Sequence, residues 1–182
     1  MKNRTSEQVE LCPNRLAGIG LKKEEILKNC LSRGGRVMPV EAKDRKPDLI
    51  NRLIKVWENS VRATHLFLSD SEIKNIKKYV PKALNEIAHL IIAEDEANCL
   101  VAFMGIENGT LEMLFIAPEE RGKGLGKWLI QYGIENYSIE RLTVNEQYLQ
   151  AKGFYEHMGF RVYKRTDLDE QGNPYPIFYM SR

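Results

Sequence analysis

The sequence predicts an α/β domain whose sheet is mostly antiparallel, and three observations support this. Short β-favouring runs alternate with amphipathic helical runs along most of the 182 residues. Three of the β-favouring runs follow one another directly, and Asn108-Gly109, a strong hairpin signal, separates the last two. A glycine-rich turn at residues 122–126 joins a strand to a helix. The three consecutive strands should form an antiparallel meander.

Composition places the chain among ordinary soluble globular proteins, with 43% hydrophobic and 29% charged residues. Its length suits one domain and an appendage. No apolar run approaches the about 20 residues of a membrane helix, and the N-terminus lacks the apolar core of a signal peptide. Cys12, Cys30 and Cys99 are far apart and form no C-x-x-C motif, which argues against disulfides and zinc. We therefore expect a cytoplasmic protein that binds neither a membrane nor a metal.

The net charge of +2 hides an asymmetry. Residues 1–46 carry 11 Lys/Arg against 6 Asp/Glu, whereas the remainder carries 16 against 19. The basic segment has no clustered stripe with interleaved aromatic residues, which argues against a nucleic-acid partner. The acidic remainder favours a cationic acceptor by electrostatic steering.

The chain divides into an N-terminal extension, residues 1–34, and a domain over residues 35–182. Within the extension, residues 21–31 have a helical face that the pair Gly34-Gly35 closes. Whether the extension packs on the domain or bridges subunits stays open, as does the choice between monomer and homodimer.

The first elements of the domain follow from local signals. Val37 to Glu41 is a short strand, and Pro47-Asp48 opens a helix whose apolar positions recur every three or four residues. Ser69-Asp70 is the N-cap of a second helix, which Pro81 should end or kink. Further strands are expected over residues 88–94, 100–106, 110–116, 141–145, 160–167 and 176–180, and further helices over 124–137 and 147–158.

The glycine-rich turn has the chemistry of a phosphate site, because the first helical N–H groups lack partners and the helix dipole favours an anion. A Walker A loop is excluded, since Arg121 stands where its first glycine should be and Trp128 where its hydroxyl should be. The dinucleotide fingerprint started at Gly122 fails, because Lys127 occupies its third glycine position.

The spacing that fits is R-x-x-G-x-G, formed by Arg121, Gly124 and Gly126. It resembles the pyrophosphate-binding motif of the GNAT superfamily, the N-acetyltransferases that use acetyl-CoA. A second signature, residues 144–147, Ala151 and residues 154–160, is similar to the V-N-x-x-N…A…F-Y-x-x-x-G-F pattern of bacterial GNAT enzymes.

Two further segments carry the resemblance. Residues 57–68 look like the first-helix segment of small bacterial lysine or polyamine acetyltransferases, and the hairpin at residues 169–176 resembles theirs too. The resemblance covers about residues 36–182. It implies the GNAT fold, a mostly antiparallel mixed sheet splayed between its fourth and fifth strands with helices on both faces. Tyr148 departs from the pattern, because the family usually has a second asparagine there.

The resemblance also implies a site. Tyr155 matches the general acid that protonates the departing thiolate. The candidate base comes from the residues themselves: Glu112 is a lone carboxylate on the strand face of Leu114 and Ile116, and it serves either as the base or as a salt-bridging or solvent-facing residue. His65, in the loop after the first helix, is the other candidate base. Trp57 and His65 are candidates for binding the acceptor. The candidate contacts of acetyl-CoA are the strand backbone, the glycine turn and one asparagine, namely Leu114, Phe115, Ile116, Arg121, Gly122, Lys123, Gly124, Leu125, Gly126, Lys127 and Asn145.

The expected function is acetyl-CoA-dependent N-acetylation of a primary amine by direct attack. A module that binds acyl-CoA without catalysis is one alternative, and an aminoglycoside- or antibiotic-modifying acetyltransferase is another. The choice among lysine, polyamine and aminoglycoside acceptors stays open.

Overall fold

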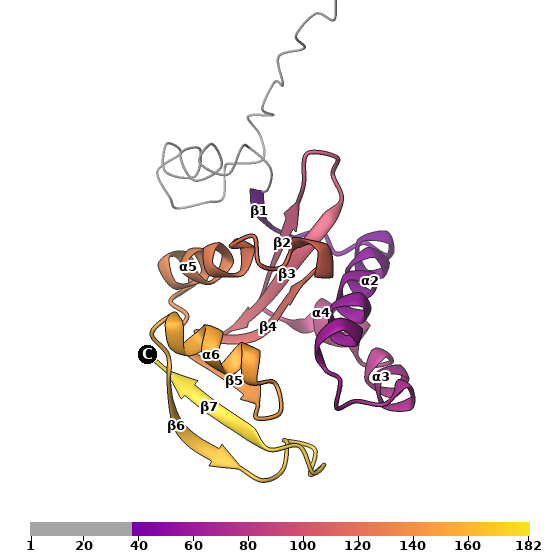
Figure 1. Ribbon diagram of the computed structural model, residues 1–182. Helices are drawn as coiled ribbons and strands as arrows, with labels where there is room; N and C mark the ends of the chain where they lie inside the picture. Colours follow the sequence, from indigo (N-terminus) through magenta and orange to yellow (C-terminus); the bar gives the residue numbers. More distant parts are fainter. Residues whose placement is uncertain (1–37) are drawn as a thin grey trace, which may run out of the picture.

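One seven-stranded sheet organises residues 38–182, the part of the chain that the computed structural model describes (Figure 1). Its strand order is β1-β2-β3-β4-β5-β7-β6. All neighbouring strands are antiparallel except β4 and β5, which are parallel. The strands are β1 (Met38–Glu41), β2 (His89–Glu94), β3 (Leu100–Glu107), β4 (Thr110–Ile116), β5 (Arg141–Asn145), β6 (Arg161–Thr166) and β7 (Ile177–Ser181).

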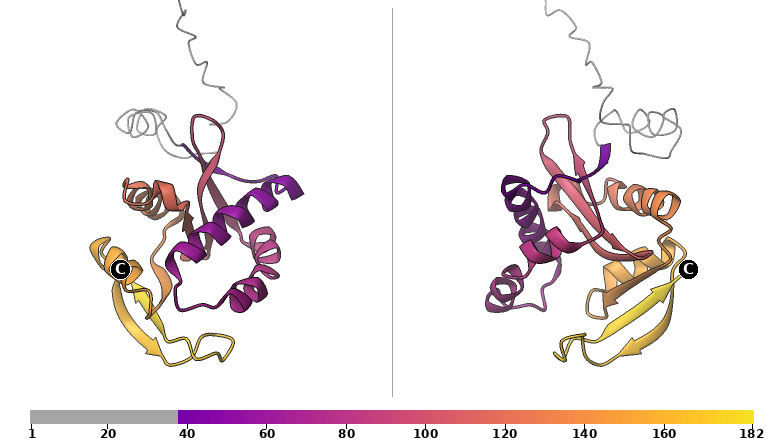
Figure 2. Two further views of the ribbon diagram at one scale, coloured as in Figure 1. Left: turned by 45° about the vertical axis from the view of Figure 1, so that its right-hand side comes forward. Right: turned by 180° about the vertical axis from the view of Figure 1, so that it is seen from behind.

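Helices cover both faces of this sheet. Figure 2 shows α2 and α3 on one side of the strands and α5 on the other. The helices are α2 (Pro47–Thr64), α3 (Asp70–Lys77), α4 (Val80–Glu86), α5 (Leu125–Tyr137) and α6 (Leu149–His157), and a 3-10 turn, η2 (Pro118–Glu120), precedes α5.

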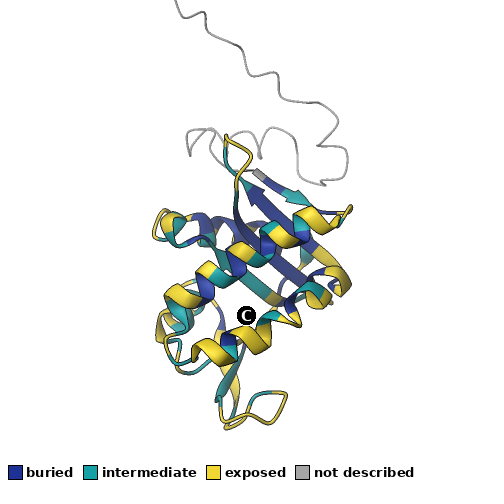
Figure 3. Ribbon diagram, turned by 90° about the vertical axis from the view of Figure 1, so that its right-hand side faces the viewer, coloured by how far each residue is buried: buried dark blue, intermediate teal, exposed yellow. Residues whose placement is uncertain are grey.

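Strand alternation sorts the apolar side chains into two cores. Along β2, Leu90 and Ile92 join the core under α2, α3 and α4, whereas Ile91 and Ala93 join the core under α5. This follows from the period of two, which points successive side chains to opposite faces. Figure 3 shows the result, buried strands behind helices whose outer faces are exposed.

The sheet splays between β4 and β5. These strands pair only at Thr110 with Arg141 and at Leu111 with Leu142. From Glu112 onward β4 no longer pairs with β5, and the two strands diverge. The splay between the fourth and fifth strands, expected from the resemblance, is confirmed.

Local sequence signals account for several turns and caps. Ser69 caps α3 in a capping box with Glu72, as the Ser69-Asp70 pair predicts. Asn108 and Gly109 have φ values of 47° and 71°, the left-handed pair that the hairpin signal requires.

One helix is missing from the sequence-based prediction. Pro81 was expected to end or kink the helix starting at Asp70, but α3 already ends at Lys77 and Val80 begins a new helix, α4. Proline suits the first helical turn, where its missing N–H costs nothing, so Pro81 helps to start α4. The extension over residues 1–34, the helix expected at 21–31 and Val37 lie outside the described residues.

Candidate functional site

A cavity of about 380 Å³ lies between the glycine turn and α6. Side chains from α2, β4, the glycine turn and α6 surround it. Its lining residues are Ser60, Leu114, Ile116, Glu120, Arg121, Gly122, Gly124, Gly126, Lys127, Tyr148, Gln150, Ala151, Phe154, Tyr155 and His157. We call it the larger cavity.

The glycines of the turn have backbone and packing reasons to be there. Gly122 and Gly124 have φ values of 74° and 81°, a region that residues with a Cβ adopt at a cost. A Cβ on Gly126 would lie 3.1 Å from Cδ1 of Ile116 and 3.4 Å from the ring of Phe154. The turn therefore brings bare backbone to the wall of the cavity.

The start of α5 supplies hydrogen-bond donors to this wall. Gly124 is the N-cap of α5, and its carbonyl accepts the hydrogen bond of the Trp128 N–H. The N–H groups of the residues before Trp128 lack partners within the helix and, with the helix dipole, favour an anion. Lys127 adds a positive side chain to the same lining. The arrangement suits a diphosphate.

A smaller cavity of about 180 Å³ lies at the splay. The diverging parts of β4 and β5 form its sides, and the loop after α2 and the start of α6 complete it. It is lined by His65, Leu111, Glu112, Met113, Leu114, Phe115, Thr143, Val144, Asn145, Tyr148, Ala151 and Tyr155.

Four residues line both cavities: Leu114, Tyr148, Ala151 and Tyr155. Tyr155 is half-buried and packs edge-on against Phe154 and Phe160, with ring centroids 5.2 Å and 6.2 Å away. Burial, and to a lesser degree Tyr148, raises the pKa of Tyr155 above its usual value of 10.0. The phenol therefore holds its proton at neutral pH at the boundary between the two cavities.

Glu112 enters the smaller cavity through a β-bulge. Gly105 pairs with Met113 and Ile106 with Leu111, so Glu112 is the extra residue of β4. Such a residue is released from the regular ladder and its side chain is re-aimed. Burial raises the pKa of Glu112, with further contributions from the charges of Glu170 and Glu107. Glu112 is an exposed residue that solvent can reach, and its raised pKa makes its carboxylate a stronger base than that of an ordinary surface glutamate.

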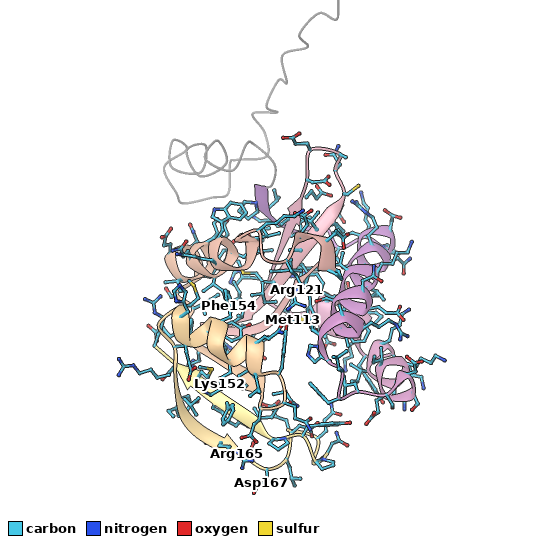
Figure 4. All side chains as sticks on the ribbon, viewed as in Figure 1. Met113, Arg121, Lys152, Phe154, Arg165 and Asp167 are labelled. Atoms are coloured by element: carbon cyan, nitrogen blue, oxygen red, sulfur yellow. The ribbon has the colours of Figure 1, made fainter. Side chains whose placement is uncertain are left out.

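Arg121 connects the two cavities through its side chain. Its Nη2 donates a hydrogen bond of 2.7 Å to the hydroxyl of Tyr148, and the Tyr148 ring lies 5.1 Å from that of His65. Figure 4 labels Arg121 of the turn before α5, together with Met113 of β4 and Phe154 of α6. The sequence predicted Arg121 as a contact of acetyl-CoA and showed Tyr148 as a departure from the family pattern, but it gave no sign that the two side chains meet.

His65 is neutral in this environment. Burial, with a smaller effect of the Arg121 charge, lowers its pKa from 6.5 to about 4. Its Nδ1 lies 2.7 Å from Oγ1 of Thr64, and its ring also contacts Phe67 at 5.4 Å.

The β6–β7 hairpin reaches across to α3 on the outer side of the smaller cavity. The hydroxyl of Tyr175 donates a hydrogen bond to the Glu72 carboxylate, and its ring lies 5.9 Å from that of Phe67. At the end of β6, Arg165 forms ion pairs with Glu146 and Asp167, and Figure 4 labels Arg165 and Asp167 there.

The structure brings most of the expected site residues together. Of the residues expected to contact acetyl-CoA, seven line the larger cavity, namely Leu114, Ile116, Arg121, Gly122, Gly124, Gly126 and Lys127. Phe115 and Asn145 line the smaller cavity instead, beside the catalytic candidates Glu112 and Tyr155 and the acceptor candidate His65.

Three expected residues line neither cavity. Trp57 is 4% exposed and belongs to the core under α2, because the apolar face of that helix turns onto the sheet. Leu125 is equally buried, in the core under α5. The Lys123 side chain pairs with Glu120 at 2.9 Å, although its backbone remains in the turn.

Sequence reasoning missed the α6 wall of the larger cavity. Gln150, Phe154 and His157 line it, together with Ser60 of α2. The spacing of the α6 residues by three and four places them on one helix face, and this was the available signal. No sequence pattern marked Ser60 as a lining residue, because its position depends on how α2 packs across the sheet.

Within residues 38–182, no three His, Cys, Asp or Glu side chains gather as metal ligands. No helix of this region has both the length and the apolar character to cross a membrane.

Comparison with known proteins identifies the family. The model of the GNAT acetyltransferase domain matches residues 58–174. The peptidyl-lysine N-acetyltransferase YjaB of Salmonella typhimurium is 39% identical over 126 residues, which cover 69% of this chain and 86% of the relative. YjaB of Escherichia coli is 36% identical over 129 residues, covering 71% and 87%.

Solved structures agree with this result. The apo form of Escherichia coli YjaB superimposes with a TM-score of 0.71 at 32% identity and covers 80% of this chain and 96% of its own. The PaiA N-acetyltransferase of Thermoplasma acidophilum, solved with coenzyme A, has the same fold, with a TM-score of 0.59 at 23% identity and coverage of 80% and 99%. With the glycine turn, the splayed sheet and these matches together, the chain belongs to the GNAT acetyltransferases, enzymes of the acyltransferase class that use acetyl-CoA.

Proposed function

We propose that this enzyme transfers the acetyl group of acetyl-CoA to the side-chain amine of lysine in a peptide or protein. The observation that carries the proposal is the position of Tyr155 at the boundary of two cavities. One cavity has the glycine turn and the other has Glu112, so a donor and an acceptor can meet beside one hydroxyl. The name of the YjaB relatives, peptidyl-lysine N-acetyltransferase, supports lysine as the acceptor.

The larger cavity fits acetyl-CoA. Gly122, Gly124 and Gly126 line it with backbone alone, so the N–H groups at the start of α5 can donate to the pyrophosphate, and Lys127 adds a positive charge. Beyond the splay, the backbone of Leu114 and Ile116 lacks a β5 partner and is free to pair with the pantetheine amides as an added strand would. When bound there, acetyl-CoA supplies an activated thioester.

Glu112 prepares the acceptor. A lysine ammonium, with a pKa near 10.4, must lose a proton before its nitrogen can attack a carbonyl. Glu112 stands in the smaller cavity with a raised pKa, so it accepts that proton directly or through one water. Glu170 and Glu107, whose charges act on Glu112, also attract a cationic side chain.

Tyr155 completes the reaction as general acid. As the C–N bond forms and the C–S bond breaks, the Tyr155 hydroxyl gives its proton to the leaving sulfur. The second proton that the nitrogen loses on becoming an amide returns to the Tyr155 oxygen, directly or through solvent, and Glu112 releases the first proton to solvent. Burial keeps the phenol protonated until then. The same burial raises the pKa of a thiol beside it. The pKa values of the proton donor, Tyr155, and of the CoA thiol that receives the proton therefore rise together.

The deciding experiment is an acceptor screen with the full chain. Thiol release and mass spectrometry should detect acetylation of lysine-containing peptides, with spermidine and an aminoglycoside as competing acceptor classes. Lysine peptides should give the highest kcat/KM. A higher kcat/KM for spermidine or the aminoglycoside would show that the acceptor is not a lysine peptide. Binding of CoA without transfer to any amine would show that the protein is an acyl-CoA-binding module.

A further inference from the structure

Thr64 determines which nitrogen of His65 carries the proton. The Thr64 hydroxyl lies 2.8 Å from the Ser60 carbonyl and 2.7 Å from Nδ1 of His65. A carbonyl oxygen only accepts, so the single hydroxyl hydrogen must go to Ser60 for that contact to be favourable. The hydroxyl then accepts from His65, which places the imidazole hydrogen on Nδ1.

The other nitrogen is left with a free lone pair. Among the described residues, Nε2 of His65 makes no hydrogen bond, while every buried side-chain nitrogen or oxygen has a partner. Since no buried polar side-chain atom among the described residues lacks a partner, the unpaired Nε2 must be in contact with solvent. The space that His65 lines is the smaller cavity, which also holds Glu112 and Tyr155.

The ring is held in this orientation by its neighbours. Phe67 and Tyr148 contact it at 5.4 Å and 5.1 Å, and the Thr64 bond prevents rotation about its axis. Tyr148 is in turn fixed by Arg121. A neutral imidazole with a fixed tautomer is a preorganised hydrogen-bond acceptor. Its side chain is already ordered in the free protein, so binding a ligand costs little further conformational entropy.

We infer that Nε2 of His65 accepts a hydrogen bond from an N–H of the acceptor amine and so orients the nitrogen lone pair toward the thioester. The inference rests on the proposed function and deepens it, since it assigns His65 as a positioning residue that touches the acceptor while Glu112 takes the proton. A group held neutral is suited to orientation rather than to proton removal, because it is a weak base.

The tautomer can be measured on the wild-type protein without any activity. Long-range ¹⁵N–¹H NMR correlations distinguish protonated from unprotonated imidazole nitrogens, and His65→Gln identifies the signal among the three histidines. Wild type should show a proton on Nδ1 and none on Nε2. Addition of Nα-acetyl-lysine methylamide with CoA, which cannot react, should shift the Nε2 signal. A proton on Nε2, or no shift at saturating amine, would overturn the inference.

Kinetics separate positioning from packing. His65→Phe keeps a ring between Phe67 and Tyr148 but has no acceptor, and it should raise the KM for a lysine peptide roughly 3–10-fold, the worth of one hydrogen bond. The KM for acetyl-CoA should not change. His65→Gln retains an acceptor oxygen and should recover most of the loss. Equal KM values for the peptide in wild type and His65→Phe would contradict the inference.

Thr64 offers a matched pair. Thr64→Ser keeps the hydroxyl, whereas Thr64→Val keeps the shape and removes it. Only Thr64→Val should give mixed tautomers and a raised peptide KM. If wild type acetylates no lysine peptide, the proposed function fails, while the NMR measurements still decide the tautomer and the amine contact.

Discussion

The Tyr155 hydroxyl is the residue-scale feature on which the proposed chemistry depends. Tyr155→Phe removes one oxygen from a ring that packs against Phe154 and Phe160, so the fold and CoA affinity should stay almost unchanged. Transfer should slow by roughly 10²–10⁴-fold, the usual worth of a positioned acid. Thiol release measured against pH checks this, because the variant should regain rate where the thiolate leaves unprotonated. Superimposable pH profiles would leave Tyr155 as a packing residue.

His65 should make stability depend on pH. Its folded pKa of about 4 lies below the ordinary value of 6.5, so the unfolded chain takes up the proton first as pH falls. The stabilisation is complete above pH 6.5 and is lost progressively as pH falls toward 4. The loss amounts to at most about 3 kcal/mol.

Urea unfolding at several pH values checks this prediction. His65→Gln cannot be protonated, so its stability should fall less than that of wild type between pH 6.5 and 4. An equal loss of stability in wild type and His65→Gln would mean that other titratable groups account for the acid sensitivity.

At the scale of elements, the turn before α5 should depend on its left-handed glycines. Gly124→Ala introduces a side chain at φ 81°, which costs about 1–2 kcal/mol of strain and adds a methyl group to the turn that is proposed to bind the diphosphate. CoA affinity should fall by about tenfold or more. Isothermal calorimetry measures it. Gly153→Ala is the control, since Gly153 lies in α6 with nothing within 4 Å of an added Cβ. Unchanged affinity in a folded Gly124→Ala protein would place the diphosphate elsewhere.

At the scale of the whole molecule, the two cores and both cavities are built from residues 38–182, the part of the chain that the structure describes. A chain of residues 35–182 should therefore fold and acetylate with a kcat/KM within about threefold of the full chain, because the residues lining both cavities fall between 60 and 157. Thermal unfolding and the lysine-peptide assay check this. Loss of activity with an unchanged unfolding temperature would assign residues 1–34 a part in the reaction.

The sequence by itself determined the features that neighbouring residues control. The Ser69 cap, the Asn108-Gly109 hairpin and the glycine-rich turn before a helix each depend on a few consecutive residues, and the structure has all three as predicted. The strand meander and the GNAT fold followed from such local signals together with the resemblance. Pro81 was misread because a proline that breaks one helix can equally well start the next.

Only the tertiary structure decided which side chains from different elements contact one another. The bulge at Glu112 depends on the register of β3 against β4, and the Arg121–Tyr148 bond joins residues 27 positions apart. Trp57 shows the same limit, since its helical period marks an apolar face but only the docking of α2 on the sheet puts that face into the core. The free lone pair of His65 likewise depends on which atoms surround the ring. Periodicity specifies the direction of a side chain relative to its own element, and the packing of elements against one another decides what that side chain meets.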